Sequence, residues 1–139
     1  MAKYSDDLAN EICEAIANSS YGLRRLCISN PHWPHRATIM RWLASNEIFR
    51  IKYQAAKELQ ADYLVDEMVE IADDSREDEL LDKHGNTYMN KEFVKRSELR
   101  VRTREIVAKM LAPRKYGSAN EMKLAELGKK LEDAINGGK

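Results

Sequence analysis

The sequence between residues 23 and 47 reads LRRLCISNPHWPHRATIMRWLASNE. Apolar residues recur at helical spacing in its first and last thirds, which predicts two short helices. Ser29-Asn30-Pro31 ends the first helix, and Pro34 delays the second until about His35. Two short helices joined by a tight, irregular turn are typical of a helix-turn-helix unit.

Another short helix is expected before this unit. Ser5 can cap it, and Asp6 and Asp7 lie in its first turn, where negative charge is favourable at the positive end of the helix dipole. Three short helices within about 45 residues make a compact head. We therefore expect residues 1–46 to form a helix-turn-helix domain.

Two long helices are predicted after the head. Nothing interrupts a helix from Glu47 to about Asp73, a length of ~40 Å. A second helix is expected from Lys91 to Leu111, ended by Pro113. We expect the two to form an antiparallel hairpin, with the apolar positions of the second helix facing the first. These positions are Val94, Leu99, Ile106, Val107, Met110 and Leu111.

The remaining segments complete an all-α fold. Residues 74–90 are acidic at first and then contain Gly85-Asn86, a turn signal consistent with a small β-hairpin. Ser118 and Glu121 form a capping box for a last helix that Gly137-Gly138 ends. The predicted domains are thus a head at 1–46, a central oligomerisation domain at 47–117, and a helical tail at 118–139.

Charge is unevenly distributed, although the formal net charge is zero. No acidic residue occurs between Glu14 and Glu47, and residues 91–115 contain nine basic residues against three acidic ones. Local fields matter more to a polyanion than the total, so DNA binding by the head is one interpretation of this pattern, and a solvated face of a small structural helix bundle is the other. Arg24 and Arg25 are candidates for phosphate contacts. Candidates for base edges at the start of the second helix of the unit are His35, Arg36, Ala37, Thr38 and Arg41.

Catalytic and metal-binding motifs are missing from the sequence. It has no GxxxxGK[ST], GxSxG or HExxH pattern, and its run of carboxylates lies in a polar connection without a rigid scaffold for metals. Cys13, Cys27, His32 and His35 match no closed zinc module. We expect no enzyme activity, no metal and no cofactor. The sequence also lacks a signal peptide and an apolar run of ~20 residues, which argues against a membrane protein.

The two long helices carry more apolar residues than one shared face can bury. A second face is expected to meet neighbouring copies, and a head-to-tail contact of this kind closes into a ring. The residues predicted to take part in oligomerisation are Tyr53, Leu59, Tyr63, Leu64, Met68, Leu99 and Val107.

Two stretches resemble the terminase small subunits of tailed double-stranded DNA bacteriophages, in particular the short, ring-forming kind. The first is ATIMRWL at residues 37–43, followed by NEIFRIKY at 46–53 and EIAD at 70–73. The second is LRVRTR at residues 99–104, followed by KMLAPRKYG at 109–117. The ending APRKYG is the more specific of the two, because many regulators share a helix-turn-helix.

The resemblance implies a subunit that binds the packaging start on viral DNA and loads a separate large subunit with ATPase and nuclease activities. It also implies an octamer or nonamer in the host bacterial cytoplasm, with the tail after Gly117 as a docking or ring-rim segment. A dimeric transcriptional regulator or excisionase-like protein is the main alternative, although it does not need two long helices. A small metal-dependent nuclease and an unrelated helical scaffold are further alternatives.

Overall fold

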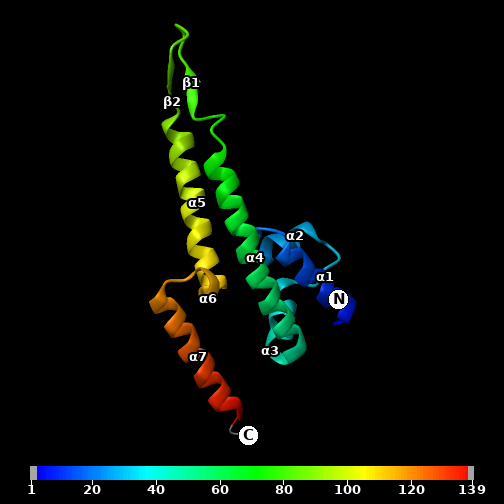
Figure 1. The fold of residues 1–139 in the computed structure, drawn as a ribbon. Helices are drawn as coiled ribbons and strands as arrows, with labels where there is room; N and C mark the ends of the chain where they lie inside the picture. The colour runs from blue at the N-terminus through cyan, green and yellow to red at the C-terminus, as the bar shows by residue number, and fades with distance from the viewer. Residues whose placement is uncertain (1–2, 138–139) are drawn as a thin grey trace.

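The computed structural model describes residues 3–137 and has an elongated shape (Figure 1). A head of three short helices packs against α4 (Glu47–Asp73), which pairs antiparallel with α5 (Lys91–Leu111); we call the α4–α5 pair the stalk. The all-α prediction is confirmed. The elements are α1 (Asp6–Ala17), α2 (Leu23–Ser29), α3 (Arg36–Ser45), α4 (Glu47–Asp73), β1 (Glu79–Leu81), β2 (Thr87–Met89), α5 (Lys91–Leu111), α6 (Pro113–Tyr116) and α7 (Ala119–Gly137).

The core of the head surrounds Phe49, which belongs to the first turn of α4. Phe49 is fully buried, and the rings of Tyr4, Trp42 and Tyr53 pack around it with centroids about 6 Å away. The packed unit extends along α4 as far as Ala56. The head is therefore built on the first third of α4, beyond the boundary at residue 46.

A single residue, Asn46, separates α3 from α4. Its side chain accepts a hydrogen bond from the Phe49 amide at 3.0 Å and caps α4. The guanidinium of Arg50 donates to the carbonyl oxygen of Leu43, one of the last carbonyls of α3, at 3.2 Å. This short, capped junction fixes the direction of the stalk relative to the helix-turn-helix unit.

The stalk has a narrow core made of small residues. Ala61 on α4 and Ala108 on α5 are buried with Ala112, and Val65, Leu111 and Tyr116 flank them. The expectation that Leu99, Ile106 and Met110 face α4 is wrong, because these side chains are 55%, 53% and 74% exposed. The buried residues of this contact are alanines, and Leu99, Ile106 and Met110 lie outside it.

A two-stranded antiparallel hairpin forms the tip of the stalk, a conformation with which the Gly85-Asn86 turn signal is consistent. Leu80 pairs with Tyr88 at its centre, and Gly85 adopts a φ of 82° in the turn. A carboxylate oxygen of Asp82 accepts hydrogen bonds from the amides of His84 and Asn86. The tip lies at the opposite end of the stalk from the head (Figure 1).

The last two helices follow the stalk at its lower end. Pro113 begins α6, where the missing amide proton of proline costs no helical hydrogen bond. The predicted tail helix is confirmed as α7, which among the described elements packs only against α6. It runs away from the stalk (Figure 1), and its side chains Leu127, Leu131 and Ile135 are exposed.

Candidate nucleic-acid interface

The four arginines predicted to contact DNA lie on the surface of the head. Arg24 and Arg25 belong to α2, and Arg36 and Arg41 belong to α3; all four are exposed. None of them forms an ion pair with a carboxylate of the described residues. The head therefore presents positive charge that no acidic neighbour in the described structure neutralises.

The first turn of α3 combines exposed and buried candidates. His35 is the N-cap, and its Nδ1 accepts a hydrogen bond from the amide of Ala37 at 3.1 Å. Thr38 is only 7% exposed, and its hydroxyl accepts a hydrogen bond from a guanidinium nitrogen of Arg41 at 3.1 Å. The structure thus places Thr38 inside the head, where it positions Arg41, while His35, Arg36 and Ala37 remain on the surface.

The turn between α2 and α3 is tied to α1 by a residue that the sequence reasoning missed. One carboxylate oxygen of Glu11 accepts a hydrogen bond from Trp33 Nε1 at 2.6 Å and lies 2.8 Å from His32 Nε2. These two contacts lower the pKa of Glu11 below its ordinary value. Trp33 itself is buried. No local motif marks Glu11, since its partners lie more than 20 residues further along the chain.

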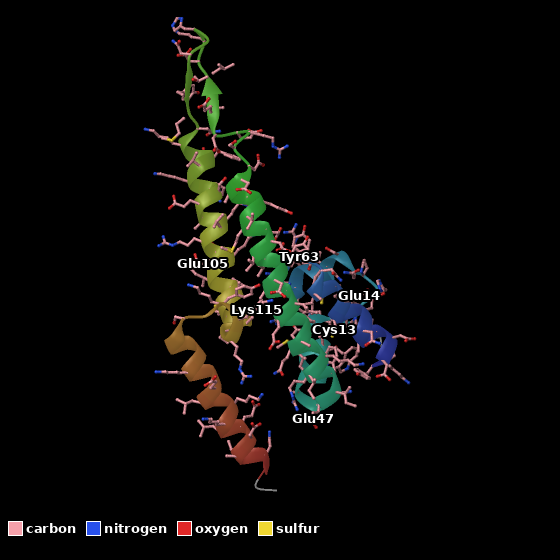
Figure 2. All side chains as sticks on the ribbon, viewed as in Figure 1. Cys13, Glu14, Glu47, Tyr63, Glu105 and Lys115 are labelled. Atoms are coloured by element: carbon pink, nitrogen blue, oxygen red, sulfur yellow. The ribbon has the colours of Figure 1, made fainter. Side chains whose placement is uncertain are left out.

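The predicted oligomerisation residues fall into three environments. Leu59, Tyr63 and Leu99 are exposed on the stalk, and Tyr63 is labelled in Figure 2. Met68 and Val107 are half-buried. Tyr53 instead packs against the head core, and Leu64 is 4% exposed within its own chain. Five further large apolar side chains of the described stalk are exposed and are not among the predicted oligomerisation residues: Ile48, Ile51, Val69, Ile106 and Met110.

No group of three or more histidine, cysteine or acidic side chains within the described residues is arranged to hold a metal. In the acidic connection after α4, the guanidinium of Arg76 binds both oxygens of Asp74 and lowers the pKa of that carboxyl to about 2. Cys13 and Cys27 are free thiols whose pKa values are raised by burial. Within the same residues, no helix is long and apolar enough to span a bilayer.

A helix-turn-helix head whose surface arginines form no ion pair with a described carboxylate, carried on an antiparallel helical stalk, defines a class of small all-helical proteins. Comparison with known proteins places the chain within that class. The family described as bacteriophage Sf6, terminase small subunit-like, matches residues 4–123. A search among curated proteins gave no match.

Three solved structures agree with this assignment. All are crystal structures of point variants of the terminase small subunit of the bacterial virus Sf6, and each superimposes with a TM-score of 0.65 over 85% of the chain. The first is 34% identical and 85% of its own length is covered; the other two are 32% identical and 80% covered. The chain belongs to the Sf6-like family of phage terminase small subunits. This confirms the resemblance drawn from the sequence.

Proposed function

We propose that this chain is the DNA-recognition subunit of a phage packaging terminase, working in the host cytoplasm. Its head binds the packaging start on double-stranded viral DNA, its stalk assembles the chain into a closed ring, and the ring loads the large subunit. The subunit itself hydrolyses neither ATP nor DNA. Family membership implies DNA, a large subunit and further copies of the chain as partners.

The observation that carries DNA recognition is the surface of α2 and α3. Four exposed arginines lie on these two helices within a segment that has no acidic residue between Glu14 and Glu47. In a helix-turn-helix, the second helix enters the major groove while the first lies across the backbone. Arg36 and Arg41 on α3 are suited to guanine edges, and Arg24 and Arg25 on α2 are suited to phosphates.

The composition of the stalk supports self-association. Its own core consists chiefly of alanines, whereas large apolar side chains on both helices remain exposed. Leu99, Ile106 and Met110 recur at spacings of seven and four residues, so they share one face of α5, and an exposed apolar face is typical of an interaction site. Burying it against a copy of the chain in a head-to-tail arrangement closes a ring, for which eight or nine subunits are proposed. The proposed interface consists of Leu59, Tyr63, Val69, Leu99, Ile106 and Met110.

Each domain of the chain is proposed to have its own role. Residues 1–46, with the start of α4, form the DNA-binding head, and residues 47–117 form the oligomerisation domain. Residues 118–139 provide the ring rim or the docking segment for the large subunit. The apolar side chains of α7 support that assignment, because Leu127, Leu131 and Ile135 are exposed on the described helix.

Titration of the purified chain against duplexes cut from the viral genome tests the proposal. We expect the duplex with the packaging start to bind more tightly than a shuffled duplex of equal length, with affinity falling steeply as salt is raised. We also expect the chain to change the ATPase rate of the purified large subunit. Equal affinity for both duplexes together with no effect on the large subunit contradicts the proposal.

The dimeric regulator makes a different prediction for the same preparation. A regulator with this head would be a dimer that prefers a palindromic site. Light scattering therefore separates the two functions, because the mass of a closed ring exceeds that of a dimer several-fold. A dimer on palindromic DNA would favour the regulator.

A further inference from the structure

The loop between α1 and α2, residues 18–22, is held by the stalk rather than by the head alone. Gln60 on α4 is 3% exposed, and its side-chain amide donates to the carbonyl oxygens of Ser19 at 3.0 Å and Tyr21 at 2.9 Å. The two amide protons of Gln60 are thus both used. Its oxygen accepts a hydrogen bond from Lys57 Nζ at 3.2 Å, so the buried amide is fully satisfied.

Few side chains fit this position. An isosteric apolar residue would leave two carbonyl oxygens without their donors, which is costly because buried polar groups need partners. A glutamate would place a carboxylate against two carbonyl oxygens. Lys57 is half-buried, and burial lowers the pKa of its ammonium group. Gln60 gives that ammonium group a hydrogen-bond acceptor.

The anchored loop presents an aromatic ring to a candidate phosphate-binding residue. The guanidinium carbon of Arg25 lies 3.8 Å from the centroid of the Tyr21 ring, which is a close cation–π contact. Arg25 is exposed and forms no ion pair with a described carboxylate. An aromatic ring restricts the motion of the guanidinium without neutralising its charge, whereas a carboxylate partner would neutralise it.

We propose that Tyr21 and Gln60 are positioning residues for a DNA phosphate contact made by Arg25. The inference rests on the proposed DNA binding and assigns roles to two residues outside the helix-turn-helix unit. Gln60 fixes the backbone of the loop, the loop fixes the Tyr21 ring, and the ring holds the guanidinium ready for a phosphate oxygen. A helix of the stalk thereby takes part in DNA binding without touching DNA.

The arrangement also connects assembly with recognition. Gln60 lies next to Leu59, an exposed residue of the proposed ring interface, and one turn before Tyr63 and Leu64. The proposed subunit contact at Leu59 is therefore adjacent in the sequence to Gln60, which holds the loop between α1 and α2. In a ring, the position of each Arg25 relative to its neighbours is set by α4 rather than by a flexible linker.

Binding of a fluorescent mixed-sequence duplex at several salt concentrations tests the inference on the full chain. We expect Tyr21→Leu to weaken binding about two- to fivefold, the size of an exposed cation–π contact. Tyr21→Phe keeps the ring and should bind like the wild type. Arg25→Ala should lower the slope of log affinity against log salt by about 0.9, the value for one phosphate contact. Ile28→Ala, on the same helix at a 72% exposed position, is the matched control and should change nothing.

A double-mutant cycle separates positioning from general damage to the fold. In the Arg25→Ala background, Tyr21→Leu should have no further effect on affinity, and the same should hold for Gln60→Met. Unchanged or tighter binding by Tyr21→Leu, or a loss that adds fully to that of Arg25→Ala, would overturn the inference. If the wild type itself binds no duplex at low salt, the proposed function fails as well, so the two failures are distinguishable.

Discussion

The carboxylate of Asp62 on α4 accepts a hydrogen bond from Lys115 Nζ on α6 at 2.7 Å. The hydroxyl of Tyr116 donates to the same carboxylate oxygen. The chain between these residues runs up the stalk, around the tip and back down, so the contact closes the hairpin at its lower end (Figure 2). This contact gives a physical reason for the APRKYG ending. Pro113 begins α6, and the side chains of Lys115 and Tyr116 bind α6 to α4 through Asp62.

The first prediction is that the contact of Asp62 with Lys115 and Tyr116 makes the free energy of unfolding decrease in acid. Hydrogen bonds from Lys115 and Tyr116 lower the pKa of Asp62 below its ordinary value of 3.8. A carboxyl with a lowered pKa adds stability that is complete above the unfolded-state pKa and is lost as pH falls through the folded-state pKa. We expect Asp62→Asn to lower Tm at neutral pH and to reduce the further drop of Tm below about pH 4.

Thermal melts followed by circular dichroism from about pH 7 to about pH 3 measure this effect. Glu105→Gln is the matched control, because among the described residues the ion pair of Glu105, which Figure 2 labels, is an i,i+4 contact with Lys109 along the same helix. It should keep the acid dependence of the wild type. An acid dependence of Asp62→Asn identical to that of the wild type would show that the contact does not stabilise the fold.

The second prediction concerns the joint between the head and α4. Phe49→Ala removes a fully buried ring from the centre of the head core and should lower the free energy of unfolding by about 3–5 kcal/mol. The neighbouring Ile48 is 64% exposed, so Ile48→Ala should change stability by less than about 0.5 kcal/mol. Urea unfolding followed by tryptophan fluorescence measures both. Equal effects of the two substitutions would contradict the assigned core.

The third prediction separates the two kinds of arginine on the head. Arg36→Ala should cost about 1–3 kcal/mol of binding free energy on the preferred duplex and relax specificity at one base pair. Arg24→Ala should weaken all duplexes alike and flatten the salt slope by about one unit. A panel of single-base-pair variants titrated at several salt concentrations distinguishes these patterns. The assignment of α3 to base reading fails if Arg36→Ala weakens every duplex equally.

The fourth prediction tests the ring. Leu99→Asp or Tyr63→Asp would place a carboxylate against the neighbouring copy in the proposed interface. Burying an unpaired charge is costly, so we expect either substitution to lower the mass of the assembly measured by light scattering. Leu81→Asp, at a 70% exposed position on the tip, serves as the control and should assemble normally. Leu64 is unsuitable, because it is buried within its own chain and a charge there would test folding. A wild-type mass of a monomer or dimer would exclude the ring.

The order and bounds of the longer helices were predictable because local signals set them, whereas the short α6 was not predicted. Proline at positions 31, 34 and 113 and the capping side chains of Ser5, Asn46 and Asn90 act within one helical turn, so they can be recognised in the sequence. The tip hairpin was predictable for the same reason. Its turn requires a positive φ, and Gly85 supplies it.

The packing of the stalk was not predictable from the same kind of pattern. Apolar residues on α5 occupy more than one face, so periodicity alone did not reveal that Ala108 would face α4 while Leu99 and Met110 would face solvent. Glu11 and Gln60 were missed for a related reason. The partners of Glu11 lie about 20 residues away within the head, and those of Gln60 lie about 40 residues away, so the first contacts need a folded head and the second need the head packed against α4.

The uninterrupted length of α4 makes the stalk a mechanical lever. The helix has 27 residues and extends about 40 Å, and its first turns are locked into the head through Phe49. A rotation of the head by about 10° would therefore carry the far end of α4 through about 7 Å, since the helix transmits the angle along its whole length. In the proposed DNA complex, bending of the DNA at the head would then displace the tip hairpin at the far end of the stalk.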